Sequence, residues 1–439
     1  MPNSTVPTGW RISKVRDLGE IQLGRQRSPS TENGANMVPY LRVANVYDGW
    51  IDYSDVLQMH FSPTEQQKYA LRRGDILLNE GQSLELVGRS AVYDGPDDRY
   101  CFQNTLVRFR AGSAIEIAYA RAMFKRWLDI GHFTKIAKQT TSIAHLGADR
   151  FAKLDALVPP LPEQRTIGQV LNTVGEAILR TEQLIAKLKQ TKQGLLHDLL
   201  TCGIDENGEL RDSERQAEQF KESPLGKIPH SWDVLRLRDL AAGGLSNGVF
   251  KEPNRAGAGV PLINVGDLYS QFGIDLMKVE RFRATQKELR RFGVAPGDVF
   301  FTRSSLNLSG IAQCNVVRDV PVVAVFECHL MRLRTVTRLA VPEYVALWCR
   351  APHARSFFMG RAKQVTMTTI SQADIYPLLV PVPPVQEQRR IVFVLDSIEE
   401  RIRREIGIAE KLAALKQALM DDLLTGRVRV TPLLAEPPP

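Results

Sequence analysis

The sequence Pro-Pro-Leu-Pro-Glu-Gln-Arg-Thr-Ile at residues 159–167 returns as Pro-Pro-Val-Gln-Glu-Gln-Arg-Arg-Ile at residues 383–391. The match continues without a gap from Pro159 to Thr201 against Pro383 to Thr425, and 20 of these 43 positions are identical. A separation of about 224 residues is far longer than the period of about 20–50 residues that is typical of a solenoid. The chain therefore contains a duplicated unit, and this stretch is its better-matched part.

Both copies of the stretch have the apolar spacing of a long helix. Apolar residues recur every seven positions, with others four positions further on, which predicts a seam between two helices. One amphipathic helix packed on its own domain is the alternative, but the shared register favours pairing of the two copies. The predicted seam residues are Ile167, Leu171, Val174, Ile178, Leu188 and Leu195, and Ile391, Leu395, Ile398, Ile402, Leu412 and Leu419.

The segment before each stretch is also duplicated, although less closely. Short apolar or alternating runs bounded by Gly, Asp and Pro predict strands, and Gly74-Asp75 and Gly297-Asp298 predict turns that lead into them. Helical stretches near 115–130 and 342–358 make each domain mixed α and β. The predicted boundaries are a first domain at 1–158, a helix at 159–202, a linker at 203–231, a second domain at 232–382, a helix at 383–426 and a disordered tail at 427–439.

Composition narrows the classes of function. The net charge of +8 and pI of about 9.2 favour an anionic partner. Five cysteines without a Cys-x-x-Cys pair, and seven histidines without metal spacing, predict no metal site and reduced thiols in a cytoplasmic protein. Neither a signal peptide nor an apolar run long enough to span a membrane is present in the sequence.

Catalytic motifs are missing from the sequence. The prolines at 159–160 and 383–384 lack the flanking Asn or Asp and aromatic residue of an amino-methyltransferase, and Gly226-Lys227 is not a phosphate-binding loop. Asp75 and Glu80 have the spacing of nuclease carboxylates, but no lysine follows. The sequence thus predicts a non-catalytic chain. A nuclease or methyltransferase fused to its own reader would need such a motif, and a purely structural coiled-coil adaptor would not need two divergent domains.

Motifs across nearly the whole chain resemble the specificity subunits of type I restriction-modification systems. They are the Pro-Pro-x-x-Glu-Gln-Arg start of each helix, Leu-Leu-Thr at 199–201 and 423–425, and the lead-in Ser223–Trp232. The first domain departs from the pattern, with only Val6–Trp10 as its lead-in. The resemblance implies an α+β protein: two mixed α/β target-recognition domains joined by two long antiparallel helices in a pseudo-two-fold arrangement.

The resemblance also implies partners. They are double-stranded DNA, two modification subunits that methylate adenine with S-adenosylmethionine, and restriction subunits that translocate and cut DNA. The chain itself would hold no cofactor and would lie in the cytoplasm at the nucleoid. Domains held about one DNA turn apart, roughly 34–36 Å, could face one side of a duplex. Since the domains differ, we expect an asymmetric, bipartite target whose spacer follows the helices.

Base readout requires polar side chains on exposed loops, although any one such residue is more often a phosphate contact or a surface polar group than a base reader. The strongest candidates follow the Gly-Asp strands, where Asn79-Glu80-Gly81-Gln82 differs completely from Thr302-Arg303-Ser304-Ser305. The candidates in the first domain are Arg25, Gln26, Arg27, Ser28, Arg42, Asn45, Asn79, Gln82, Ser83, Gln103, Asn104, Lys138, Gln139, Thr140, Thr141 and Ser142. Those in the second are Asn247, Lys251, Asn254, Arg255, Asn264, Asp267, Arg303, Ser304, Ser305, Asn307, His329, Lys363 and Gln364.

Overall fold

The chain forms two compact units that each combine a domain with parts of both long helices. The computed structural model describes residues 6–139, 143–270, 273–364 and 367–434. Unit 1 comprises residues 1–182 and 407–439, and unit 2 comprises residues 183–406. Each unit therefore contains one mixed α/β domain, the start of one long helix and the end of the other.

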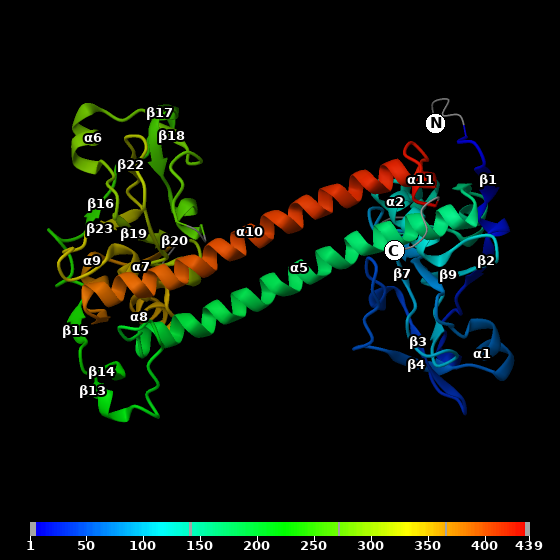
Figure 1. The fold of residues 1–439 in the computed structure, drawn as a ribbon, viewed down its shortest axis with the longest axis horizontal. Coiled ribbons are helices and arrows are strands. Elements are labelled where there is room, and N and C mark those ends of the chain that lie inside the picture. The colour runs from blue at the N-terminus through cyan, green and yellow to red at the C-terminus, as the bar shows by residue number, and fades with distance from the viewer. Residues whose placement is uncertain (1–5, 140–142, 271–272, 365–366, 435–439) are drawn as a thin grey trace. The chain divides into compact units, whose positions relative to one another are not determined.

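The two long helices are α5 (Leu161–Thr201) and α10 (Val385–Leu424). In unit 1, Ile167 and Leu171 near the start of α5 share a hydrophobic core with Leu423 and Leu424 at the end of α10. In unit 2, the end of α5 packs against the start of α10 through residues such as Leu199 and Leu395. Within each unit the helices thus run antiparallel, as expected, and Figure 1 shows them side by side. Among the described residues, no helix is both long and apolar enough to cross a membrane.

The predicted seam residues differ in how deeply they are buried. Those near the start of each helix, together with Ile402, are buried: Ile167, Leu171, Ile391, Leu395 and Ile402. The others are partly buried: Val174, Ile178, Leu188, Leu195, Ile398, Leu412 and Leu419. The heptad pattern did not predict that Leu196, Leu200, Met420 and Leu424 would be buried. Packing against the domain widens the apolar face at each helix end beyond a two-helix seam.

The domain of unit 1 is built on a four-stranded antiparallel sheet in the order β2-β9-β5-β7. A three-stranded sheet, β4-β3-β8, contains one parallel pair, and β1 pairs with β12 just before α5. A small sheet has the order β10-β11-β6. The strands are β1 (Arg11–Lys14), β2 (Gly19–Leu23), β3 (Met37–Leu41), β4 (Leu57–His60), β5 (Ile76–Asn79), β6 (Gly81–Gln82), β7 (Ser90–Val92), β8 (Cys101–Phe102), β9 (Leu106–Ala111), β10 (Lys138–Gln139), β11 (Ala144–His145) and β12 (Asp155–Val158).

Unit 2 repeats this topology sheet for sheet. Its sheets have the orders β16-β23-β19-β21, β18-β17-β22, β15-β26 and β20-β25-β24, and β17 pairs with β22 in parallel as β3 does with β8. The strands are β15 (Asp233–Arg236), β16 (Ser246–Asn247), β17 (Ala256–Ile263), β18 (Arg281–Phe282), β19 (Val299–Thr302), β20 (Ser304–Ser305), β21 (Cys314–Val316), β22 (Val325–Phe326), β23 (Leu330–Leu333), β24 (Lys363–Gln364), β25 (Thr368–Thr369) and β26 (Leu379–Val382).

Short helices cover the sheets of both domains. They are α1 (Pro63–Tyr69), α2 (Ile117–Asp129), α3 (His132–Ile136) and α4 (Ala148–Ala152) in unit 1, and α6 (Gln286–Phe292), α7 (Pro342–Arg350), α8 (Pro352–Arg361) and α9 (Gln372–Ile375) in unit 2. Helices α2 and α7 occupy equivalent places, because the Tyr119 hydroxyl donates to the Leu157 carbonyl and the Tyr344 hydroxyl donates to that of Pro381. The predicted mixed α/β character of both domains is confirmed.

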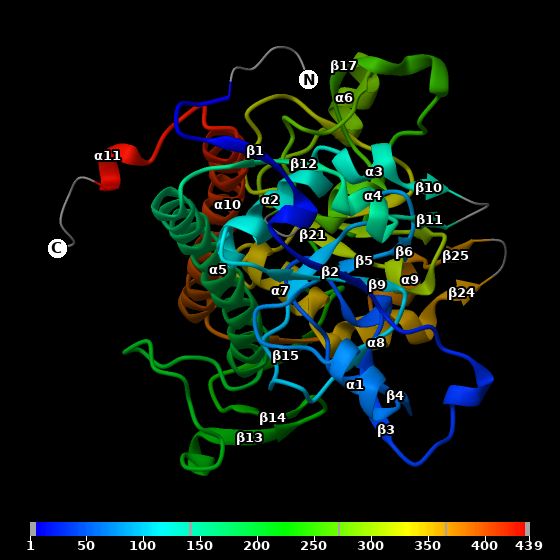
Figure 2. The same cartoon turned by 90° about the vertical axis from the view of Figure 1, so that its right-hand side faces the viewer.

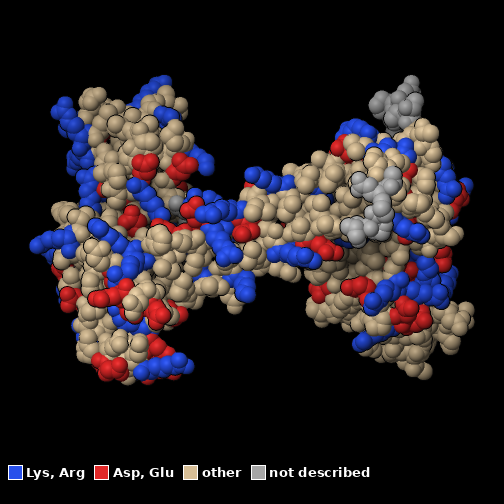
Figure 3. All heavy atoms as spheres, viewed as in Figure 1, with Lys and Arg blue, Asp and Glu red and all other residues tan. Residues whose placement is uncertain are grey.

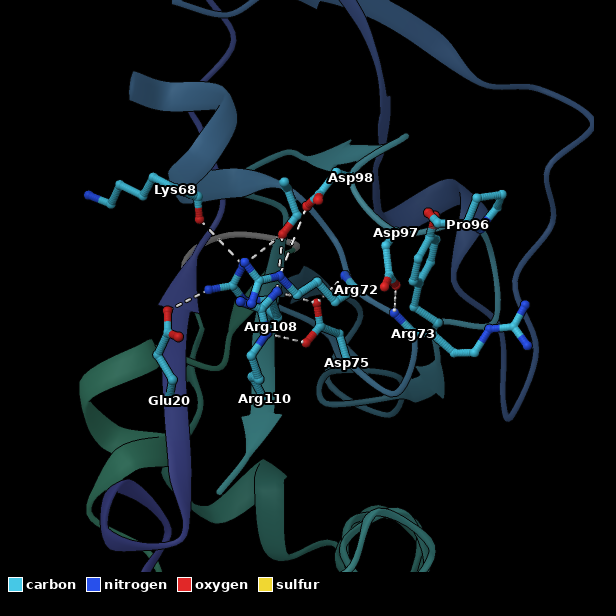
Figure 4. A network of polar contacts seen from close by, with 12 residues as sticks. Glu20, Lys68, Arg72, Arg73, Asp75, Pro96, Asp97, Asp98, Arg108 and Arg110 are labelled. Atoms are coloured by element: carbon cyan, nitrogen blue, oxygen red, sulfur yellow. Dashed lines mark hydrogen bonds and ion pairs between the residues drawn. The ribbon is translucent and has the colours of Figure 1, made fainter. Parts of the chain in front are cut away.

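The Gly-Asp pairs form the predicted turns before β5 and β19. Gly74 has a φ of +94°, a backbone conformation that favours glycine. The buried Asp75 carboxylate accepts hydrogen bonds from the Arg72 amide and from the Arg110 guanidinium (Figure 4). Asp298 accepts equivalent bonds from Ala295 and Arg334. Asp75 is thus an anchor for its own strand and for β9.

Two segments are more ordered than the sequence indicated. The segment 203–231, predicted to be a linker, contains the hairpin β13 (Phe220–Ser223) and β14 (Gly226–Pro229), in which Phe220 and Ile228 are buried. The tail at 427–439 was predicted to be disordered, and the structure describes residues 427–434 of it, where Val430 is buried and α11 covers Thr431–Leu434, while 435–439 lie outside the described residues. Each segment provides apolar contacts and an arginine to the start of a long helix, which the polar composition concealed.

A buried glutamine fixes the start of each long helix to its domain. The Gln164 side chain accepts a hydrogen bond from the Glu116 amide and donates to the carbonyls of Ala114 and Pro159. Gln388 makes the same three bonds, with the Val341 amide and the carbonyls of Leu339 and Pro383. In both glutamines the side-chain oxygen and both side-chain N–H groups have hydrogen-bond partners. The glutamine of the duplicated Glu-Gln motif therefore has a structural role at the start of each long helix.

The glutamate before each glutamine is neutralised by an arginine that lies beyond the end of the other helix. Glu163 pairs with Arg429, with 2.6 Å between Oε1 and Nη2, and its carboxylate also accepts from the Trp10 indole. Glu387 pairs with Arg211 at 2.6 Å. We name these the buried Glu–Arg pairs, since the two carboxylate side chains are only 4% and 3% exposed.

We predict that Arg211→Met will cost about 3–5 kcal/mol of unfolding free energy in unit 2, because Glu387 would remain buried without a counter-charge. The matched control is Arg215→Met in the same segment, where the arginine side chain is 89% exposed and pairs with Asp212. That change should cost less than about 1 kcal/mol. Denaturant unfolding of both variants checks this, and equal losses would contradict the assigned role of Arg211.

Candidate functional site

The structure brings the strongest candidate segments together in one small sheet of each unit. In unit 1, Gln82 on β6 lies opposite Ala144, and Lys138 on β10 lies opposite His145 (Figure 2). In unit 2, Ser304 and Ser305 on β20 pair with Thr369 and Thr368, which also pair with Lys363 and Gln364 on β24. Segments that are about 55–60 residues apart in the sequence therefore form a single surface in each domain.

These small sheets combine a common part with a divergent part. One outer strand of each small sheet has an exposed Lys-Gln pair. These pairs are Lys138-Gln139 in β10 and Lys363-Gln364 in β24. The opposite strands differ: Gly81-Gln82 in β6 against the largely buried Ser304-Ser305 in β20. Arg303 and Asn307 beside β20 are exposed, as is Ser83 beside β6. A common cationic edge beside different polar groups can hold one kind of ligand while distinguishing its details.

Several other candidates have structural partners within their own domain. Asn45 is buried, and its amide group donates to the carbonyls of Asp52 and Asp55. Asn79 is buried and donates to the Val46 carbonyl. Arg42 pairs with Asp55, Lys251 pairs with Glu280, and Asn264 caps a turn with Asp267. We do not retain these residues as readers, because a side chain that is used for the fold is not available to a ligand.

Arg25 and Arg255 have one shared role in the fold. Each guanidinium binds the capping glutamate of a short helix, Glu65 at the start of α1 and Glu288 at the start of α6. The hydrogen bond from Arg25 lowers the pKa of Glu65 to about 2, and that from Arg255 lowers the pKa of Glu288 to about 2. Both arginines therefore stabilise helix starts, which the sequence did not reveal because the partners are 40 and 33 residues away.

The remaining candidates vary in position. Gln26, Asn254 and His329 are exposed, and Arg27 forms an exposed ion pair with Glu32. Ser28, Gln103, Asn104 and Asn247 are partly buried. The candidates Thr140, Thr141 and Ser142 lie outside the described residues. On the face drawn in Figure 3, basic and acidic side chains alternate over both units, so net charge alone does not mark a binding surface there.

One group within the described ranges could in principle hold a metal ion. The ligand atoms of Glu327, Cys328 and His329 lie within 4.8 Å of one another. However, the Glu327 carboxylate already accepts a hydrogen bond from the Val265 amide, and burial raises the pKa of the Cys328 thiol. A thiol that resists ionisation is a poor ligand at neutral pH, so we assign no metal to this turn.

Sequence reasoning missed the residues that hold the domains to the helices. The Glu-Gln motif was recognised only as a repeat, and Arg211 and Arg429 lay in segments predicted to be a linker and a disordered tail. A usable signal was available, because a glutamate at the apolar start of a helix requires a counter-charge. Each segment after a Leu-Leu-Thr sequence contains an arginine that meets this need.

Comparisons with known proteins agree on one family. Residues 7–190 match the model of the type I restriction modification DNA specificity domain. The chain is 25% identical over 441 residues to the type I restriction enzyme EcoKI specificity subunit of Escherichia coli K12, covering 94% of this chain and 88% of the relative. The fold resembles the type I restriction-modification S subunit of M. genitalium, with a TM-score of 0.56, 13% identity and coverage of 96% and 97%. A chain from a solved type I restriction-modification system matches with a TM-score of 0.56, 18% identity and coverage of 97% and 100%.

The lowered pKa of Glu65 predicts a pH-dependent contribution from Arg25. A carboxylate whose folded pKa is about 2 stabilises the fold fully above its ordinary pKa of 4.5 and progressively less as the pH falls toward 2. Arg25→Met should therefore cost up to about 1 kcal/mol near pH 7, and the difference from the wild type should shrink below pH 5. Urea unfolding at several pH values measures it, with Arg27→Met as the control. A constant difference would contradict the assignment.

Proposed function

Because the chain belongs to the family of type I restriction-modification specificity subunits, we propose that it reads an asymmetric, bipartite DNA target and carries no catalytic activity of its own. Unit 1 reads one half-site and unit 2 reads the other. Modification subunits, which bind S-adenosylmethionine, dock on the long helices and methylate adenine at the site that the chain selects. Restriction subunits join the same complex in the cytoplasm of the host.

One observation supports this proposal above the others. The two domains have the same sheets, the same Gly-Asp turns and the same glutamine at the helix start, but different polar groups on β6 and β20. A common fold with divergent polar groups is what two sequence-specific readers require, since base edges are distinguished by hydrogen-bond donors and acceptors. A structural adaptor would gain nothing from that divergence.

The exposed lysines of the small sheets fit contacts to phosphate. Lys138 and Lys363 are both exposed, and each lies on the outer strand that is separated from the divergent residues by one middle strand, β11 or β25. Phosphate contacts hold a protein on the duplex, whereas polar groups beside them read the bases. We therefore assign phosphate contacts to β10 and β24 and base contacts to the less buried residues around β6 and β20, namely Gln82 and Ser83 in unit 1 and Arg303 and Asn307 in unit 2.

We predict that Lys138→Gln and Lys363→Gln will each weaken the affinity for a duplex that carries the methylated target. Each should lower the slope of log affinity against log salt concentration by about 1, because one phosphate contact is lost. Lys227→Gln on the hairpin β13–β14 removes one exposed charge outside the small sheets and is the matched control. Fluorescence anisotropy on the complex with modification subunits provides the measurement. Equal slopes for all three variants would remove the small sheets from the interface.

A second prediction separates a reader from an enzyme. The purified chain with S-adenosylmethionine and target DNA should transfer no methyl group, and activity should appear only when a modification subunit is added. Radiolabelled methyl transfer at matched protein concentrations checks this. Robust methylation by the chain alone would replace the proposal with a methyltransferase fused to its own reader.

A further inference from the structure

Unit 1 contains a pocket of about 690 Å³ that the proposed DNA interface does not use. Its walls come from α2, α5, α10 and the turn at 48–50. Apolar side chains such as Leu171, Ile178 and Met420 form part of the lining, and Trp50 stands at its edge with 54% of its surface exposed. Three cations also line it: Arg121, Lys125 and Lys416.

Two of these cations make no ion pair with the residues that the structure describes. Lys125 pairs with Asp48 and Asp129. Arg121 and Lys416 make no ion pair within the described part of the chain, and Lys416 is partly buried. Burial, with Arg121 and Lys125 nearby, lowers the pKa of the Lys416 ammonium. Asp48 and Asp129 raise this pKa, but by less than burial and the two cations lower it, and both carboxylates pair with Lys125. The Lys416 ammonium therefore has no ion-pair partner of its own among the described residues, and an anion would supply one.

None of the three carboxylates that line the pocket forms an ion pair with Lys416, and Asp48 pairs with Lys125 instead. Glu176 pairs with Arg180 one turn along α5. Glu182 lies seven residues beyond Gly175, which corresponds to about 10 Å along a helix. The Lys416 ammonium instead lies over Gly175. A Cβ atom added to Gly175 would lie 3.2 Å from Lys416 Nζ.

In unit 2, the lysine equivalent to Lys416 has a carboxylate partner. Lys192 is equivalent to Lys416 in the repeat, and it forms an ion pair with Glu399. Asp396, one turn earlier, pairs with Arg318. The positions equivalent to Glu399 and Asp396 in unit 1 are Gly175 and Asn172. Unit 1 therefore has the lysine without either carboxylate.

Unit 1 also has a cation that unit 2 lacks. The equivalence of Tyr119 and Tyr344 aligns α2 with α7, so Arg121 corresponds to Ala346 and Lys125 to Arg350. A guanidinium and an ammonium with apolar walls between them are groups that bind phosphate or carboxylate oxygens well. We propose that this pocket binds a small oxyanion from solution, which takes the place that the Glu399 carboxylate occupies in unit 2.

The test uses the full chain and inorganic phosphate, compared with chloride at equal ionic strength. Phosphate should raise the thermal unfolding midpoint of the wild type, and titration calorimetry should detect binding. Lys416→Met should weaken that binding by about tenfold or more, because it removes the ammonium. Lys192→Met is the matched control in unit 2 and should leave phosphate binding unchanged.

A second pair of variants keeps every cation in place. Gly175→Glu restores the carboxylate that unit 2 has at Glu399, so it should abolish phosphate binding while raising the unfolding midpoint without phosphate. Gly175→Ala should also raise that midpoint, through helix propensity alone, but should retain phosphate binding. This pair remains informative even if Lys416→Met does not fold.

The remaining outcomes would overturn the proposal. An equal effect of phosphate on all variants would indicate an adventitious ion only, and loss of the effect in Lys363→Gln would place the anion at the DNA interface. No phosphate effect, together with weaker binding of modification subunits to Gly175→Glu, would mean that a partner's acidic side chain fills the pocket. The DNA-reading proposal does not depend on any of these results, because its tests measure affinity for DNA.

Discussion

A buried carboxylate at the start of each long helix is the constraint on which the two units depend. Glu163 and Glu387 lie buried where a domain meets a helix, and each carboxylate is paired with an arginine, Arg429 or Arg211. Each arginine follows the end of the other long helix. The ion pair therefore joins the beginning of one repeat to the end of the other within each unit, and the antiparallel packing of α5 and α10 in that unit agrees with it.

Within the repeat, the parts that support the fold are shared by both units, whereas the residues proposed to read DNA differ. The Gln164 and Gln388 bonds, the Gly-Asp turns and the sheet orders are the same in both units. The residues of β6 and β20 lie away from these supports, and they differ. The long helices also differ between the two copies. Beside Lys416, α5 has Gly175 where α10 has Glu399.

Much of the fold could be predicted from the sequence, because the repeat and the heptad spacing depend on local patterns. Ile167, Leu171, Ile391 and Leu395 are buried as predicted. The roles of Arg25, Asn45 and Asn79 could not be predicted, because the sequence does not identify the partners of these side chains. In a sequence, a polar residue that supports the fold cannot be distinguished from one on a binding surface. The pairing of β6 with β11 likewise depends on the tertiary fold, which no short motif specifies.

The central claim is that each unit reads its own half-site. The most direct measurement replaces residues 232–382 with the matching domain of a related specificity subunit and sequences the methylated DNA of the host strain. The account predicts that one half of the methylated motif changes while the other half and the spacer stay the same. A motif that changes in both halves, or in neither, would contradict it.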